Sequence, residues 1–180
     1  MRTISIILAA CAVALMSSQA LAQSPAPAAA PAQPSAGGTP DAIPFDIPYG
    51  QSIGLERAKQ AMAAAEAEAR KRNWKMSVAV VDTNGDLVQF QRMEGALIAS
   101  STISIGKART AARYRRETRV FFNAFETGHS YVSTLDPTLV ASAGGFPLVE
   151  GGKVIGAIGC SGGTGDQDAA VCKVGAEVVK

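Results

Sequence analysis

The stretch that most constrains the fold is the glycine-rich segment at residues 144–163, GGFPLVEGGKVIGAIGCSGG. Residues 146–149 and 153–159 are two apolar runs joined by Glu-Gly-Gly. Two such runs separated by a short glycine-containing loop predict a β-hairpin. Gly156 and Gly159 fall inside the second strand, where glycine marks a bulge or the close approach of another backbone or a ligand. We favour tight packing over a flat floor for a ligand, because packing more often explains a glycine inside an element.

A second hairpin is predicted at residues 76–91. Residues 76–81 and 87–91 have the composition of strands, and the DTNGD segment between them carries the Asn-Gly pair typical of a tight turn. Asp82 and Asp86 also resemble the start of a calcium loop. That loop would be too short and lacks a distal Glu, so we assign both residues to turn chemistry.

Helices are predicted at residues 55–73, 98–114 and 117–125, and again after the second hairpin. The first has apolar side chains at helical spacing and Ser52 as its expected N-cap, and the last begins at Thr164 or Asp166. The order is helix, hairpin, helices, hairpin, helix. It predicts an α+β fold with a single, mostly antiparallel sheet covered by helices, including a long N-terminal and a C-terminal helix.

The first 22 residues have the pattern of a secretory signal peptide. Arg2 precedes an apolar run at residues 4–16, and Ala-Leu-Ala stands directly before Gln23. The run is short for a membrane span, so a retained anchor is the less favoured alternative. We therefore expect a periplasmic or secreted protein that does not span the membrane.

Two further regions follow the signal peptide. Residues 23–50 predict a Pro/Ala-rich disordered linker, since this composition buries too little apolar surface to offset its ordering entropy. Phe45, Ile47 and Tyr49 are the linker side chains able to dock on the domain. Residues 51–180 have the length of one ordinary domain.

The net charge and the cysteine content limit which partners and which redox compartment the sequence supports. The net charge of +2 gives no electrostatic case for nucleic acid binding. Beyond the signal peptide the cysteines are Cys160 and Cys172. They form a disulfide in an oxidising compartment or remain free thiols, and the sequence leaves both alternatives open.

A cluster of cations begins within the second predicted helix and continues beyond its end. Six lie within thirteen positions: Lys107, Arg109, Arg113, Arg115, Arg116 and Arg119. Arg109, Arg113 and Arg116 are spaced to share one helical face, and such a strip binds carboxylates or phosphates. The alternative is a solvated or subunit-facing surface, because these cations lack acidic partners nearby in the sequence.

His129, the single histidine, follows Gly128 in a loop. A lone loop histidine is a candidate haem ligand, and a surface histidine without a role is the alternative. One histidine and two distant cysteines give no metal-ligand spacing.

Five segments carry a family signature when taken together. They are VAVVD with Asn-Gly at residues 78–85, RMEGA at 92–96, KARTA at 107–111, GGFPL at 144–148, and GAIGCSGG at 156–163 followed by Asp168. In this order they resemble the GlcG/HbpS haem-binding family. The resemblance implies a profilin-like fold that assembles into a compact homo-oligomer. It also implies several roles, because some members are exported haem binders linked to redox sensing. Others lie beside glycolate or diol metabolism, and a related domain is fused to a corrinoid adenosyltransferase.

The chain departs from the family pattern at two points. Cys160 stands where the family usually has an aliphatic residue, so a Cys160–Cys172 pair would be a feature of this chain. The first helix contains no histidine, although haem contacts in some members come from that region.

The resemblance and the residues together predict an exported haem-binding protein for haem buffering, storage or redox sensing, with a possible sensor partner. Lys107, Arg109 and Arg113 would pair with the propionates, and Thr118 would contact the ligand. His129 would bind the iron, ahead of Tyr114 or Met93, which are less favoured.

Two other functions remain as hypotheses. One is an enzyme or accessory protein acting on a small carboxylate such as glycolate, with the cationic strip and the glycine-rich strand as its pocket. Asp82, Glu94 and Asp168 are its candidate acids, although turn and cap roles explain them equally well. The other is a structural homo-oligomeric module.

Overall fold

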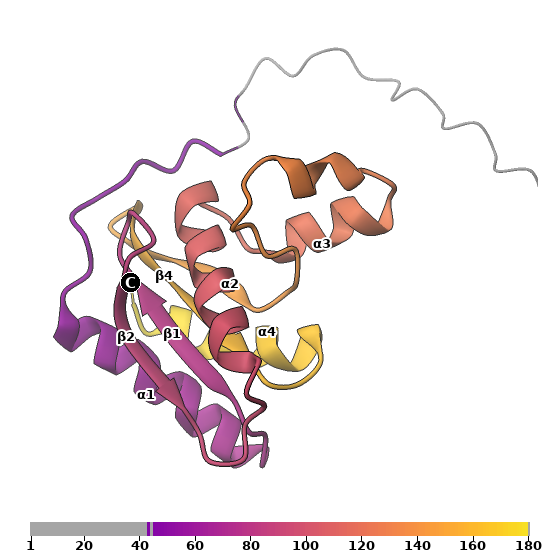
Figure 1. The fold of residues 1–180 in the computed structure, drawn as a ribbon. Helices are drawn as coiled ribbons and strands as arrows, with labels where there is room; N and C mark the ends of the chain where they lie inside the picture. The colour runs from indigo at the N-terminus through magenta and orange to yellow at the C-terminus, as the bar shows by residue number, and fades with distance from the viewer. Residues whose placement is uncertain (1–42, 44, 180) are drawn as a thin grey trace, which may run out of the picture. The chain divides into compact units, whose positions relative to one another are not determined.

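The computed structural model describes residues 43 and 45–179, which form one four-stranded antiparallel sheet and its covering helices (Figure 1). The predicted signal peptide and most of the predicted linker lie outside the described residues. The elements are α1 Leu55–Lys71, β1 Ser77–Val81, β2 Leu87–Arg92, α2 Ser100–Tyr114, α3 Arg119–Glu126, the 3-10 helix η1 Ser130–Thr134, β3 Gly145–Glu150, β4 Lys153–Ser161 and α4 Gly165–Glu177. The strand order is β2-β1-β4-β3. The α+β prediction is confirmed.

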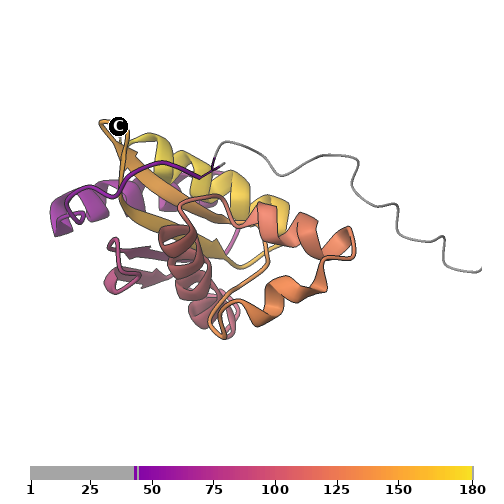
Figure 2. The same ribbon diagram turned by 90° about the horizontal axis from the view of Figure 1, so that it is seen from above.

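The helices cover both faces of the sheet. Figures 1 and 2 show α2 on one face, and α1 and α4 together on the other. Because side chains alternate along a strand, each strand contributes to two cores. Val78 and Val80 of β1 belong to the core under α1 and α4. Ala79 and Val81 belong to a smaller, alanine-rich core under α2.

The glycines of β4 are packed against backbone. A Cβ on Gly159 would lie 2.5 Å from the nitrogen of Ala108 and closer still to the carbonyl oxygen of Ser104, both in α2. A Cβ on Gly156 would collide with the carbonyl oxygen of Val81. The packing interpretation of these glycines is confirmed. The ligand-floor interpretation is wrong, because α2 lies directly on this strand.

Turn and cap residues act locally. The Asp82 carboxylate accepts hydrogen bonds from the backbone nitrogens of Asn84 and Asp86, each 2.9 Å long, which confirms turn chemistry. Thr164 caps α4 through a capping box with Gln167, as predicted. The Ser52 cap was predicted wrongly, because Gly54 precedes α1 without a side-chain cap.

Residues 45–50, called the strap below, are part of the folded unit. Tyr49 forms a β-bridge with Val154, and the nitrogen of Gly50 donates to the Val154 carbonyl at 2.8 Å. The nitrogen of Val154 donates in turn to the Pro48 carbonyl at 2.8 Å. The folded unit therefore begins before residue 51, within residues 23–50 that were predicted to form the linker.

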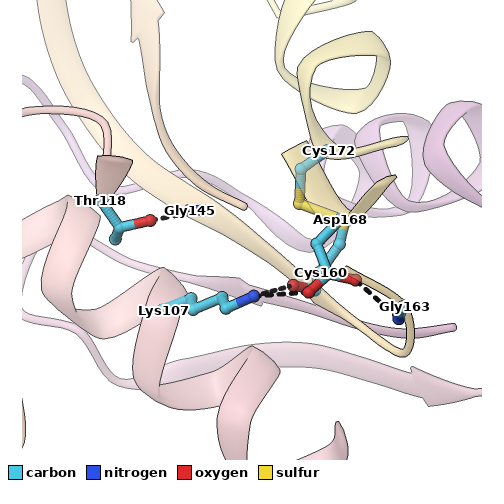
Figure 3. The surroundings of a disulfide bond; sticks show 7 residues. All are labelled: Lys107, Thr118, Gly145, Cys160, Gly163, Asp168 and Cys172. Carbon is cyan, nitrogen blue, oxygen red and sulfur yellow. Dashed lines mark hydrogen bonds and ion pairs between the residues drawn. A yellow bond between two sulfur atoms is a disulfide. The ribbon is translucent and has the colours of Figure 1, made fainter. Parts of the chain in front are cut away.

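Cys160 and Cys172 form a disulfide that joins β4 to α4, so the disulfide is the alternative that the structure adopts (Figure 3). Their Cα atoms are 5.5 Å apart, and both residues are fully buried. The bond holds the sheet to its C-terminal helix. None of the helices in the described part of the chain has the length and apolar character needed to cross a membrane.

Candidate functional site

Two predicted site residues share the outer side of α2. Arg109 and Arg113 are one helical turn apart, and both side chains reach the turn between β1 and β2. The Nε of Arg109 donates to the Gly85 carbonyl at 3.1 Å, and the Nε of Arg113 donates to the Asn84 carbonyl at 3.1 Å. These backbone contacts hold both guanidinium groups in place beside one another.

A groove of about 380 Å³ lies along the same side of α2. Its helical wall is Thr102, Ile105, Gly106 and Arg109, and its other wall is residues 137–140. Its volume falls within the range of small-molecule sites, and such sites combine apolar walls with a few oriented polar groups. In this groove, called the α2 groove below, Arg109 supplies the cationic group.

The rim of the α2 groove carries mixed charge. A terminal nitrogen of Arg113 lies 3.4 Å from the Asp136 carboxylate and 3.2 Å from the Thr138 hydroxyl. Hydrogen bonds from the Thr138 backbone and hydroxyl lower the pKa of Asp136. Arg109 forms no ion pair with a described residue. Arg109 is therefore the cation of the groove that a ligand anion can neutralise.

Arg116 does not share the face of Arg109 and Arg113, so that part of the prediction is wrong. The helix α2 ends at Tyr114, and Arg115 adopts a left-handed conformation with φ of 54°. This change of direction at Arg115 turns Arg116 away from the strip.

Lys107 lies on the opposite, sheet-facing side of α2 and is 1% exposed. Its Nζ donates to the Asp168 carboxylate at 2.6 Å and to the Cys160 carbonyl at 3.2 Å (Figure 3). Asp168 also accepts from the nitrogen of Gly163 at 3.0 Å. Burial lowers the pKa of Lys107, and the attraction of Asp168 opposes that shift. Lys107 is therefore committed to an interior ion pair.

Thr118 is likewise internal and fully buried. Its hydroxyl donates to the Ser142 carbonyl at 2.6 Å. It also accepts from the nitrogen of Gly145 at 2.9 Å (Figure 3). These bonds connect the start of α3 to the start of β3. The side chain thereby serves the fold at a point away from the α2 groove walls.

His129 is exposed between α3 and η1. Its Nδ1 lies 3.0 Å from the Thr127 hydroxyl, and its ring meets the Tyr131 ring edge-on at 6.2 Å. Within residues 43 and 45–179, no group of three His, Cys, Asp or Glu side chains forms a metal site. Because Nδ1 contacts Thr127, Nε2 is the ring nitrogen that would be available to bind an iron.

The expectation that the cations lack acidic partners nearby in the sequence is wrong for Arg119, and three of these cations also pair with acids from distant segments. Lys107 pairs with Asp168, and Arg119 lies 2.8 Å from Asp166. Arg113 pairs with an acid as well, on the groove rim. Asp168, Asp166 and Asp136 come from distant segments, which neighbouring positions in the sequence do not reveal. Glu117, 3.3 Å from Arg119, is the exception and lies two positions away. Of the candidate acids, Asp82 and Asp168 are occupied by turn and ion-pair contacts.

A family model described as haem degrading protein HbpS-like matches residues 53–177. The chain belongs to the HbpS-like family. The chain is 42% identical to Protein GlcG of Escherichia coli K12 over 109 residues, which cover 61% of this chain and 81% of GlcG. It is 29% identical to the corrinoid adenosyltransferase PduO of Citrobacter freundii over 120 residues, which cover 65% of this chain but 36% of that enzyme.

Solved structures share the fold. A double mutant of Streptomyces reticuli HbpS matches with a TM-score of 0.68 and 29% identity, covering 81% of this chain and 99% of that one. A structure described as a PduOC:Heme complex matches with a TM-score of 0.66 and 26% identity, covering 72% and 96%. The haem in that description belongs to the PduOC protein.

Proposed function

We propose that this HbpS-like protein is exported and binds haem, for buffering, storage or redox sensing. The observation that carries the proposal is the likeness to a family domain whose structure is described as a haem complex. The description of the matching family model, haem degrading protein, points to the same ligand.

The α2 groove is the proposed haem site, because its residues fit the chemistry of haem. Haem has a flat apolar macrocycle and two propionates. Ile105, Leu139 and Val140 supply apolar groove walls, and Arg109 supplies a guanidinium without an acidic partner among the described residues. Guanidinium groups recognise carboxylates through paired hydrogen bonds.

We assign the haem propionates to Arg109 and Arg113. Lys107, which the sequence suggested as a third propionate contact, is left out. Lys107 would have to break its buried pair with Asp168 to reach a surface ligand. Thr118 is omitted for a similar reason, since its hydroxyl already makes both internal bonds.

His129 is the proposed iron ligand. It precedes η1, and the chain then continues into the groove wall at residues 137–140. The iron of a bound haem would supply any redox chemistry. With haem bound, Arg109 and Arg113 would hold the propionates, His129 would present its imidazole, and the apolar groove walls would contact the macrocycle.

The disulfide supports export. Disulfides persist in oxidising compartments and are rare where thiols are kept reduced. A buried Cys160–Cys172 bond therefore fits a periplasmic or secreted protein, as does the signal-like pattern of the first 22 residues. A partner that reads the redox state of the haem would have to lie in the same compartment.

A homo-oligomer is proposed from the surface of α3. Val120, Phe122 and Phe125 are each about two-fifths exposed, at 42%, 40% and 39%. Apolar side chains gathered on one short helix mark a contact surface. This feature alone would also suit an assembly module that binds no ligand.

The second candidate function is binding of a small carboxylate such as glycolate. The observation in its favour is Arg109, which would pair with any carboxylate that enters the α2 groove. Haem is preferred because a small polar acid would leave the apolar groove walls unused.

A haemin titration of the chain from Gln23 onward, followed by absorbance, tests the proposal. We expect a saturable Soret band at a defined stoichiometry, with a changed spectrum in His129→Ala. Thr127→Ala is the matched control, because it removes the hydroxyl beside Nδ1 and leaves the imidazole. An unchanged spectrum in His129→Ala would move the iron ligand elsewhere. The absence of saturable binding would contradict a haem function.

A further inference from the structure

Arg116 is enclosed by aromatic rings at the end of α2. The central carbon of its guanidinium lies 3.4 Å from the centre of the Phe45 ring, 4.9 Å from that of Phe121 and 5.9 Å from that of Tyr114. Phe121 and Tyr114 themselves meet edge-on, with ring centres 4.9 Å apart. The guanidinium is thus stacked on one ring and bounded by two others.

The same guanidinium has an unmet hydrogen-bonding capacity. Its Nε is buried and has no hydrogen-bond partner in the described part of the chain. No described carboxylate pairs with Arg116 either, and burial lowers its pKa. A buried donor without an acceptor is unusual in a folded protein and needs an explanation.

The ring that covers Arg116 comes from the strap. The strap is anchored at its C-terminal end, where the Tyr49 hydroxyl donates to the carbonyls of Ala112 and Arg113 at 3.0 and 2.9 Å. A terminal nitrogen of Arg115 also donates to the Ile47 carbonyl at 2.8 Å. Phe45 lies at the opposite end, and its stacking on Arg116 involves no hydrogen bond. Phe45 can therefore leave Arg116 while these anchors remain.

We propose that Arg116, Tyr114 and Phe121 form a binding site for an aromatic carboxylate, and that the Phe45 ring occupies the ligand's place. An aromatic ring fits the position because Phe45 already stacks there. A carboxylate fits because its negative charge complements a guanidinium that has no acidic partner among the described residues and whose Nε lacks an acceptor. The site is separate from the α2 groove and does not depend on haem.

The strap makes such binding competitive. Phe45 is tethered, so its ring is present at a high effective concentration and must be displaced by the ligand. The apparent affinity is reduced by the fraction of molecules in which the ring covers Arg116. Given the usual strength of cation–π contacts, removing the ring should tighten binding by about two- to thirtyfold.

The test measures binding of 2-naphthoate to the full chain by calorimetry or fluorescence, with 2-naphthamide as its uncharged counterpart. Phe45→Ala should bind 2-naphthoate about two- to thirtyfold more tightly than the parent chain. Neither the parent chain nor Phe45→Ala should bind 2-naphthamide. Adding Arg116→Gln to Phe45→Ala should abolish the binding. Ile98→Ala and Arg92→Gln are the controls, because both residues are exposed and neither is among the side chains around Arg116.

Several results would overturn the proposal. They are a Phe45→Ala variant that binds 2-naphthoate no better than the parent chain, and binding that survives Arg116→Gln. Equal binding of the amide would also overturn it.

A measurement on the parent chain covers the case in which a variant fails to fold. As 2-naphthoate saturates the parent chain, the NMR chemical shifts of an isotope-labelled Phe45 ring should move towards those of a solvent-exposed phenylalanine. An unchanged Phe45 signal at saturation, or no binding at all, would exclude this site. Because the ligand contains no iron, these results are independent of the haemin titration.

Discussion

The two sides of α2 use the same kind of residue for different purposes. Lys107 and Arg109 are two positions apart, which places them about 200° apart around a helix. Lys107 faces the sheet, where Asp168 neutralises it in the interior. Arg109 faces outward, where it lines a groove and donates to a backbone carbonyl. A run of cations in the sequence is therefore not one electrostatic surface.

The difference has consequences for stability and for binding. Removing one partner of a buried ion pair leaves an uncompensated charge, whereas an exposed pair contributes little to the free energy of unfolding. We expect substitutions on the sheet side of α2 to affect folding. Substitutions on the outer side should affect ligand binding and leave the fold intact.

The largest effect is expected for Asp168→Ala. This variant leaves the Lys107 ammonium buried without its partner, so the free energy of unfolding should fall by about 3–5 kcal/mol in urea denaturation. Lys107→Met combined with Asp168→Leu is the control, because it removes both charges and keeps apolar volume. The double variant should recover most of the loss. A loss below about 1 kcal/mol in Asp168→Ala would mean that the pair behaves like an exposed one.

The disulfide should contribute the next largest effect. Replacing Cys160 and Cys172 with alanine opens a loop with a sequence separation of 12. For a loop of about this length the unfolding free energy should fall by roughly 3 kcal/mol. Equilibrium unfolding of the parent chain with and without a reductant gives a matched comparison. Equal stability with and without reductant would contradict a structural role for the bond.

Gly159→Ala tests the contact between α2 and β4. The added methyl group would meet the backbone of Ser104 and Ala108, so we expect a loss of about 1–3 kcal/mol from overpacking. Gly151→Ala is unsuitable as a control because its φ is 55°. Gly165→Ala, in the first turn of α4, is suitable because the added carbon would lie no closer than 3.5 Å to any non-neighbouring atom. A neutral Gly159→Ala would reopen the interpretation of β4 as an open ligand floor.

The sequence predicted the sheet architecture because its signals are local. The apolar runs beside Asn84-Gly85 and beside Gly151-Gly152 mark two hairpins, and both form. The packing of Gly159 also followed from strand chemistry. The role of Lys107 was missed, although its helical spacing from Ser104, Ala108 and Ala111 places it with the buried side chains. Its partner Asp168 lies 61 positions away, and no local pattern connects them.

The Arg116 cluster was missed for a related reason. Its geometry depends on the left-handed conformation of Arg115 and on Phe45, which the composition of residues 23–50 assigned to a linker. The aromatic residues at positions 45, 47 and 49 were the available signal. Their contact with α2 required the three-dimensional path of the strap.

The smallest stability effect is expected on the outer side of α2. Asp136→Asn removes the charge that faces Arg113 and retains an amide oxygen for the Thr138 bonds. We expect a change in unfolding free energy of about 0–1 kcal/mol. Because the pKa of Asp136 is lowered in the folded chain, its contribution is present at neutral pH. The contribution is lost as the pH falls below the ordinary value of 3.8 and through the lowered one. An effect as large as that of Asp168→Ala would remove the distinction between the two sides.

The most direct test of this distinction is the haemin affinity of the Arg109→Gln/Arg113→Gln variant, measured together with its unfolding free energy. Arg92→Gln, an exposed arginine on β2, is the control. We expect haemin binding to weaken by at least about tenfold, because two charge-assisted hydrogen bonds are lost. The unfolding free energy should change by no more than about 1–2 kcal/mol, since two hydrogen bonds to the β1–β2 turn are removed. Unchanged haemin affinity in a folded variant would contradict the assignment of the outer side of α2 to ligand binding.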